Sequence, residues 1–480
     1  MPEAASAAAE GRADGPRAGR GPGLDRERIV DAASAPVMPP CDHRPRAYAG
    51  PARDEVLALR KRYVNPAVFT LYREPIMIVE GWMQWLFDET GRRYLDMFAG
   101  IVTVSCGHAH PKVTAAVTRQ AETLAHATTI YLHPNLPRLA EKLAAKMPAG
   151  LDVTYFVNSG SEANDLAITM ARLHTGHTDV IALRNAYHGT SPAALGLTSH
   201  STWKYPVPQN TRVHHALCPD PYRSPFDGTP EDVAHRSAED IRELIRYSTP
   251  GQVAAFIAEP IQGVGGATLG APNFLKEAYA VVREHGGLCV ADEVQTGFGR
   301  TGDHYWGFQN SDVVPDIVTM AKGLGNGAPI AAVTTTAEIA ASLTRRIHFN
   351  TFGGNPVSMA AGIAVLDAIE EDGLQENCRV LGARLKDGLE ELATRHDAIG
   401  DVRGLGLMLG VELVRDRTTK EPASEAAAEI LEHARARGVL IGKGGLFGNV
   451  LRIKPPMCIT ADDVDFTLAV LDEAFETISG

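Results

Sequence analysis

The chain has 480 residues, of which 44% are hydrophobic and 6% aromatic, and this length suffices for more than one sizeable hydrophobic core. Its 46 Lys and Arg residues stand against 58 Asp and Glu residues, which gives a formal net charge of -12 at pH 7. Nucleic-acid surfaces need clustered positive charge, so this acidic balance argues against nucleic acid as a partner. Small-molecule chemistry is the better expectation.

Residues 1–50 are rich in Ala, Gly, Pro and Arg, and this composition predicts a disordered extension. A mitochondrial transit peptide is also rich in Ala and Arg, but it avoids acids, and Glu3, Glu10 and Asp14 interrupt this segment. The six scattered cysteines form no CxxC pair, which is typical of reduced thiols. No apolar stretch reaches the ~20 residues needed to cross a bilayer. We therefore predict a cytoplasmic protein with no membrane partner.

From Thr70, a stretch of alternating apolar residues with a turn at Asp88 to Gly91 predicts a β-meander. Between about residues 110 and 350, short apolar runs alternate with amphipathic helical segments. This pattern is typical of a mostly parallel sheet that is covered by helices on both faces. We predict a large α/β domain over residues 101–355.

After Pro356 the pattern predicts a long helix, a strand over LMLGVELV, a helix at about 424–438, a strand around VLRIKP and a closing helix from Ala461. We expect this tail, residues 356–480, to form a smaller α/β domain together with residues 51–100.

Five predicted strands end directly before polar residues. Ligands of an open parallel sheet bind beyond the carboxyl ends of its strands, so these polar residues are expected to meet at one edge. They are Asn158 to Glu162 after VTYFV, Asn185 to Gly189 after VIALR, Glu259 after AAFIA, Asp292 after LCVA and Lys322 after IVTMA. Together they predict a ligand site.

The turn NSGSEAN, which contains Ser159, Gly160 and Ser161, opens a predicted helix. Unpaired N–H groups and the positive end of the helix dipole bind phosphate at such a turn, with Gly160 and Ser161 as the expected contacts. An ordinary Asn or Ser helix cap explains the same residues.

Lys322 follows an apolar strand and precedes a Gly-rich loop. Partial desolvation there favours the neutral amine that forms a Schiff base, although a strand-end lysine can also simply point to water. Asp292 ends the preceding apolar strand, and a buried carboxylate is what keeps the pyridine nitrogen of pyridoxal phosphate protonated. The two residues together predict this cofactor.

Further candidate cofactor residues lie beside these two. Val294 and Gln295 follow Asp292, and Gln295 is close enough in sequence to reach the phenolic oxygen of the cofactor ring. Tyr187 or His188 is a candidate to lie flat on the ring, since aromatic side chains stack on planar π systems, but a turn with a core aromatic explains the same residues. The histidines show no metal-ligand spacing, so we predict no metal site.

Many motifs resemble those of the class III, or ornithine-type, aminotransferases of fold type I, which depend on pyridoxal phosphate. The similarity covers about residues 65–475 and includes, in order, DMFAGIVTVSCGHAHP, NSGSEAND, AYHG, EPIQG, ADEVQTGFGRTG, DIVTMAKGLGNG, FNTFGGNP and RIKPP. Within this family the alanine–glyoxylate aminotransferase 2 branch is most similar, through AYHGTSPAALGLTS, CPDPYRSPF and HFNTFGGNP.

The resemblance implies a role for each matching residue. Lys322 is the Schiff-base lysine, with Asp292 on the pyridine nitrogen. Gly160 and Ser161 hold the phosphate, and Tyr187 stacks on the ring. Thr351 reaches the phosphate of the neighbouring subunit in a homodimer, or in a tetramer built from such dimers.

The substrate residues are also implied by the resemblance. Arg452 matches the arginine that holds the substrate carboxylate, for which its two-pronged guanidinium is suited. Glu259 matches the acid that pairs with this arginine when a substrate presents an amine far from its carboxylate. An ordinary surface ion pair is the alternative for both residues. Lys454, beside Arg452, has no assigned purpose.

The expected reaction moves an amino group from alanine, β-alanine or another ω-amino acid to a small 2-oxo acid such as pyruvate or glyoxylate. A phospho-lyase that acts on a phosphorylated amino alcohol with the same cofactor is the main alternative. A non-enzymatic protein of the same fold has no need of Lys322, Asp292 and Arg452 together. An aldolase-type barrel fits poorly with the phosphate turn so far ahead of the lysine.

Overall fold

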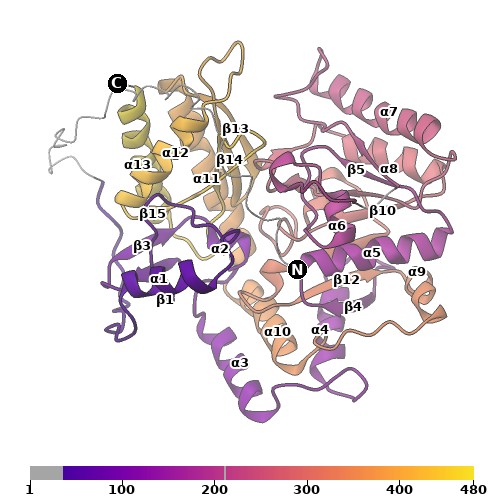
Figure 1. Ribbon diagram of the computed structural model, residues 1–480, viewed down its shortest axis with the longest axis horizontal. Coiled ribbons are helices and arrows are strands. Elements are labelled where there is room, and N and C mark those ends of the chain that lie inside the picture. The colour runs from indigo at the N-terminus through magenta and orange to yellow at the C-terminus, as the bar shows by residue number, and fades with distance from the viewer. Residues whose placement is uncertain (1–35, 210–211, 480) are drawn as a thin grey trace, which may run out of the picture. The chain divides into compact units, whose positions relative to one another are not determined.

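The computed structural model in Figure 1 describes residues 36–209 and 212–479. The chain divides into two units, residues 1–37 and 38–480, and every helix and strand given below lies in the second. Most of the extension predicted to be disordered, residues 1–35, lies outside the described residues. Residues 38–50 contain no helix or strand, but His43 stacks on Trp82 with their ring centroids 4.9 Å apart.

The largest sheet of the described chain has seven strands in the order β4-β12-β11-β10-β7-β5-β6. Its members are β4 (Val153–Val157), β5 (Val180–Leu183), β6 (Val213–Ala216), β7 (Ala255–Ala258), β10 (Leu288–Asp292), β11 (Ile317–Met320) and β12 (Ala331–Thr335). All neighbours are parallel except β12, which is antiparallel to both β4 and β11. The mostly parallel sheet is therefore confirmed. The five strands that precede the predicted polar residues all run in one direction.

Both faces of this sheet are buried. Successive side chains of a strand point to opposite faces, so each strand contributes to two hydrophobic clusters. In β5, Val180 and Ala182 pack into a cluster with α5 (Gly160–Thr175). Ile181 and Leu183 pack into a second cluster, with α7 (Pro230–Ser248) and α8 (Phe274–Glu284). Figure 1 shows α7 and α8 side by side. Burial on both faces explains why these strands are almost wholly apolar.

The rest of the described chain builds three smaller sheets. The first contains β1 (Ile78–Trp82), β2 (Trp85–Asp88), β3 (Arg93–Asp96) and β15 (Val439–Leu440); the second contains β13 (Ile399–Leu405), β14 (Met408–Leu413), β17 (Val450–Ile453) and β16 (Gly442–Gly444); the third is the hairpin of β8 (Ile261–Gln262) and β9 (Thr268–Leu269). The predicted meander is present, and its turn closes with the Gly91 N–H donating to Asp88 O at 2.9 Å.

One helix prediction was wrong. The long helix expected after Pro356 is two helices, α10 (Pro356–Glu371) and α11 (Leu374–Arg395). Gly373 separates them with a φ of 63°, a left-handed conformation that glycine adopts without steric cost and that ends a helix. The later helices are α12 (Ser424–Ala436) and α13 (Ala461–Ser479), close to their predicted positions.

The remaining α-helices are α1 (Arg53–Tyr63), α2 (Ala99–Val102), α3 (Pro111–Thr123), α4 (Asn135–Ala144), α6 (Pro192–Leu197) and α9 (Ala337–Ala341). None of the described helices is both long and apolar enough to span a lipid bilayer. β3 pairs with β15, which joins residues of the N-terminal meander to the C-terminal part of the chain. The division into domains of residues 101–355 and of 51–100 with 356–480 stays a prediction, since contacts group residues 38–480 as one unit.

Candidate active site

The turn before α5 packs against two other segments of the predicted site. A Cβ atom on Gly160 would lie 3.2 Å from the Val294 side chain, and one on Gly189 would lie 2.2 Å from Ser161 Oγ. Ser159 caps the helix, since its side chain accepts a hydrogen bond from the Glu162 N–H at 3.2 Å. The helix cap and the close backbone packing therefore coexist, and the turn lies directly beside Val294.

Asp292, at the end of β10, is 3% exposed and is held by three donors. Its Oδ2 accepts from Asn164 Nδ2 and pairs with His188 Nδ1, both at 2.8 Å, and its Oδ1 accepts from the Val294 N–H at 3.1 Å. A carboxylate has about four acceptor positions, so one remains for the pyridine nitrogen of the cofactor. The donor set therefore fits the predicted group.

Asn164 is a site residue that the sequence reasoning missed. Its amide oxygen accepts from Thr319 Oγ1 at 2.7 Å, and its amide nitrogen donates to both Asp292 and the backbone oxygen of His188. The feature of the sequence that could have identified Asn164 is its position one helical turn after Gly160 in the NSGSEAN motif. Such a residue faces the strands beneath α5.

Tyr187 and His188 have different surroundings. The imidazole of His188 is fully buried against Asp292. The ring of Tyr187 is half-buried and meets Trp203 edge to face, with centroids 5.1 Å apart, while its backbone N–H donates to Glu259 Oε1 at 3.0 Å. Of the two candidates for stacking on the cofactor, Tyr187 is the one whose ring makes no hydrogen bond to Asp292.

Lys322 begins a short 3₁₀ turn directly beyond β11. Its φ of 38° is unusual for a residue with a side chain, and such backbone strain clusters at functional sites. The pKa of the amine is lowered to about 8, chiefly by burial; the charges of Asp292 and Glu259 raise it in part, and the charge of Arg452 lowers it. The structure thus brings Lys322 together with the predicted cofactor and substrate residues.

Glu259 and Arg452 do not form an ion pair with each other in the described structure; both contact Gly263. The Gly263 N–H donates to Glu259 Oε2 at 2.8 Å, and Arg452 Nη1 lies 3.5 Å from Gly263 O. Arg452 also donates through Nε to Lys443 O at 3.1 Å, and its guanidinium covers the Phe98 ring at 5.0 Å. Burial raises the pKa of Glu259 and lowers that of Arg452 to about 10.

Lys454 and Gln295 join the same cluster. Lys454 follows Arg452 by two positions at the end of β17, so both side chains leave the same face of the chain. Its Nζ donates to Gly263 O at 3.0 Å and to Gln295 Oε1 at 3.3 Å, and the side chain is completely buried. The sequence indicated the position of Lys454 but not these partners.

Thr351 is exposed, in a segment that contacts the phosphate turn through its neighbour. Asn350 Oδ1 accepts from Asn158 Nδ2, and Asn350 Nδ2 donates to Glu162 Oε2, each at 3.0 Å. The role of Thr351 toward a second subunit stays a prediction.

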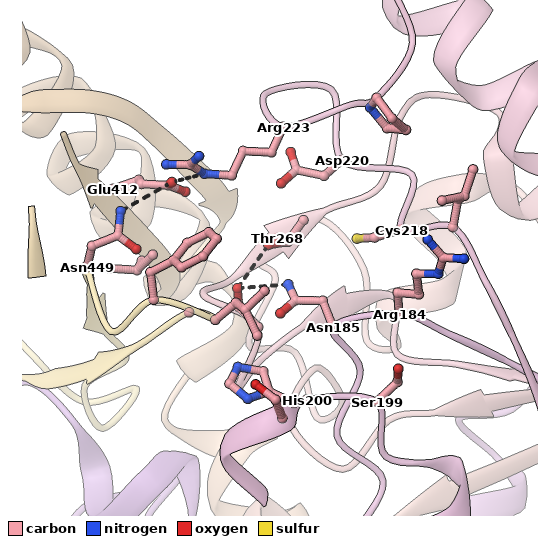
Figure 2. Close-up of a pocket in the computed structure, with 18 of the residues that line it drawn as sticks. Arg184, Asn185, Ser199, His200, Cys218, Asp220, Arg223, Thr268, Glu412 and Asn449 are labelled. Atoms are coloured by element: carbon pink, nitrogen blue, oxygen red, sulfur yellow. Dashed lines mark hydrogen bonds and ion pairs between the residues drawn. The ribbon is translucent and has the colours of Figure 1, made fainter. Parts of the chain in front are cut away.

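A cavity of about 750 Å³ has Gly265, two positions after Gly263, in its lining (Figure 2). Asn185 and Thr268 line it and both donate to Gly265 O, at 3.1 and 3.2 Å. Across the cavity, Glu412 binds Arg223 and accepts from Asn449. Neither of the predicted catalytic residues, Lys322 and Asp292, lines this cavity.

The family model for class III aminotransferases matches residues 71–475. The chain belongs to the class III aminotransferases. It is 54% identical over 435 residues to alanine–glyoxylate aminotransferase 2 homolog 2, mitochondrial, of Arabidopsis thaliana, covering 91% of this chain and 90% of the relative.

Solved structures agree with this membership. A phospholyase from Arthrobacter in complex with phosphoethanolamine is 34% identical with a TM-score of 0.82, covering 88% of this chain and 99% of that one. A thermostable (S)-enantioselective omega-transaminase from Thermomicrobium roseum is 32% identical with a TM-score of 0.83, covering 90% and 100%.

This class III aminotransferase therefore has the α/β fold of the fold type I enzymes, and its cofactor is pyridoxal phosphate. Its substrates are small molecules. The relative from Arabidopsis thaliana is named mitochondrial, so the predicted cytoplasmic location is not confirmed.

Proposed function

We propose that this class III aminotransferase transfers the amino group of alanine, β-alanine or another ω-amino acid to pyruvate or glyoxylate, with Lys322 as the lysine that carries the cofactor. The observation that carries the proposal is the amine of Lys322, whose pKa is lowered to about 8 by burial among Asp292, Glu259 and Arg452. Near physiological pH a far larger fraction of such an amine is neutral than of an ordinary lysine, and the neutral form is the nucleophile.

The cofactor is held by the residues around this amine. Asp292 has one acceptor position left and would hold the ring nitrogen, Gly160 and Ser161 would offer backbone N–H groups to the phosphate, and Tyr187 would stack on the ring. When bound, pyridoxal phosphate supplies an aldehyde that accepts the amino group and a ring that stores electrons. Three further residues support this arrangement: Ser159 caps the helix, His188 contacts Asp292, and Val294 packs beside Gly160.

Lys322 also moves the proton that the reaction requires. With the cofactor bound, its Nζ would be the base that takes a proton from the carbon bearing the donor amine and the acid that returns it. Asp292 favours this transfer because its negative charge keeps the ring nitrogen protonated.

Arg452 binds the substrate carboxylate. No described residue accepts a hydrogen bond from its Nη2, while Nε and Nη1 fix the guanidinium over Phe98. A planar guanidinium held in this way offers a directed donor to a carboxylate. Glu259 stays available to balance Arg452 when the bound amine lacks a nearby carboxylate, because its charge already acts on the arginine.

Exposed apolar side chains in the segments of Thr351 and of Leu132 support a homodimer. Ile347 is 98% exposed and Leu132 is fully exposed, and Phe352 contacts His126 with ring centroids 5.5 Å apart. Exposed apolar clusters of this kind mark protein interfaces. We propose that a second copy covers them and that Thr351 then reaches the partner's phosphate site. Sedimentation of the holoenzyme tests this, and a monomer at micromolar concentration contradicts it.

The Arthrobacter structure favours one rival function, a phospho-lyase that acts on a phosphorylated amino alcohol. The two functions differ in what turnover requires. In a transferase, each active site reacts once with an amine and then needs a 2-oxo acid before it can react again. A lyase turns over without an acceptor and releases ammonia and phosphate.

The decisive experiment mixes purified holoenzyme with a panel of amines and follows the visible absorbance of the bound cofactor. We expect alanine or an ω-amino acid to bleach it, and pyruvate or glyoxylate to restore it. Turnover of phosphoethanolamine without any oxo acid supports the lyase and overturns the proposal.

A further inference from the structure

Lys454 has no task in the proposed function, yet it is completely buried within the site. Its backbone N–H donates to Met97 O at 2.8 Å, which fixes the start of the side chain beyond β17. Its Nζ contacts two acceptors, Gly263 O and Gln295 Oε1. A buried amine needs a reason to be there, because taking it out of water is costly.

Gly263 and Gln295 already lie in close contact. A Cβ atom on Gly263 would be 2.3 Å from each of the Cδ, Nε2 and Oε1 atoms of Gln295, so the glycine faces the flat side of the amide. The amide oxygen points to Lys454, and no described residue accepts a hydrogen bond from the amide nitrogen. An amide can rotate so that its oxygen and nitrogen exchange places, unless hydrogen-bond partners distinguish the two atoms. A lysine does so, because it provides donors for the oxygen.

The charges around Lys454 favour its neutral form. Burial lowers the pKa of Lys454 well below its usual value, and the positive charges of Arg452 and Lys322 lower it further. An amine carries at least two N–H groups in either protonation state, and Lys454 has two acceptors within reach. It can therefore bridge both acceptors.

We propose that Lys454 is a positioning residue that orients the amide of Gln295, so that Nε2 faces the phenolic oxygen of the bound cofactor. The inference rests on the proposed function, because it requires Gln295 to lie beside the cofactor. Through Gly263 O, Lys454 also holds the residue that separates Glu259 from Arg452.

The test compares holoenzymes with Lys454→Met and Lys454→Gln, two side chains of equal length. Methionine removes both donors, while glutamine keeps an NH₂ group. We expect Lys454→Met to weaken cofactor binding about fivefold, as the loss of one hydrogen bond does, and Lys454→Gln to weaken it less. The pH at which the visible absorbance changes should shift in Lys454→Met in the same direction as in Gln295→Leu.

A double variant separates positioning from general support of the fold. If Lys454 acts through Gln295, Lys454→Met changes neither the spectrum nor cofactor affinity further in a Gln295→Leu background. Additive effects in the double variant, or a wild-type spectrum in Lys454→Met beside a shifted one in Gln295→Leu, overturn the inference. A wild-type chain that shows no cofactor absorbance at all contradicts the proposed function instead.

A further variant covers the case in which Lys454→Met fails to fold. Gln295→Glu keeps an oxygen for Lys454 but removes the donor that faces the cofactor. We expect it to match the wild type in thermal unfolding and Gln295→Leu in its spectrum. A wild-type spectrum for Gln295→Glu overturns the inference.

Discussion

Glu259 and Arg452 are bound to the two polar groups of one residue, Gly263: the carboxylate accepts from its N–H, and the guanidinium approaches its carbonyl oxygen. An acid and a base at the same site are thus kept near each other without a direct ion pair. A shift of the backbone at Gly263 would change the contacts of both side chains, as the proposed exchange between substrates of different length requires.

Gly263→Ala should damage this arrangement. The added Cβ would lie 2.3 Å from the amide of Gln295, so one of the two must move. We expect a loss of about 1–3 kcal/mol in the free energy of unfolding, which is the usual cost of overpacking, together with a lower kcat/KM. Urea denaturation and steady-state kinetics measure these. Gly270→Ala is the matched control, since its nearest contact would be 3.3 Å, to the side chain of Pro219.

Arg452→Met should separate carboxylate recognition from chemistry. The variant keeps an unbranched apolar stem but removes the donor for the substrate carboxylate, so KM for an amino acid donor should rise about 100-fold, the equivalent of a charge-assisted hydrogen bond of ~3 kcal/mol. A simple amine without a carboxylate should react as in the wild type. An equal loss for both donors would show that Arg452 supports the site as a whole.

Asp292→Asn should fail in two ways. The amide cannot keep the ring nitrogen protonated, and its NH₂ group or its single oxygen must meet the donors from Asn164 and His188. We expect kcat to fall by at least about 1,000-fold, the equivalent of ~4 kcal/mol, and stability to fall by about 1–3 kcal/mol for the mismatched donor. Single-turnover kinetics and thermal unfolding check the two effects. Activity near the wild-type level contradicts the role given to Asp292.

The pKa of Lys322 predicts how cofactor uptake depends on pH. A lowered pKa means that the amine is protonated below about 8 and neutral above it, so the rate at which apoenzyme attaches pyridoxal phosphate should rise with pH and level off above about 8. Between about 8 and the usual 10.5 the unfolded chain binds more protons, so apoenzyme stability should also rise with pH there. Stopped-flow absorbance follows uptake; a rate that still climbs at pH 10 contradicts the prediction.

The sequence predicted those features that depend on strand direction. Asp292 and Lys322 follow apolar runs, and parallel strands bring their carboxyl ends to one edge without any knowledge of their order. The antiparallel strand β12 could not be predicted in this way, because AAVTT is buried like its neighbours and nothing in its sequence indicates its direction. The break at Gly373 was also missed, because apolar residues continue with helical spacing on both sides of it.

Contacts between distant segments were beyond the sequence. Lys454 was visible as a second cation after Arg452, but its partners lie 191 and 159 positions away, in Gly263 and Gln295. The same holds for Asn164, whose amide meets Asp292 across 128 positions. A single chain also cannot test Thr351, whose predicted partner belongs to another subunit.

The most direct test of the account is to reduce the holoenzyme with borohydride, digest it and locate the cofactor by mass spectrometry. Reduction fixes a lysine-bound pyridoxal phosphate permanently, so the peptide that contains Lys322 should carry one phosphopyridoxyl group per chain. A label on another lysine, or full turnover by Lys322→Ala, would contradict the central claim.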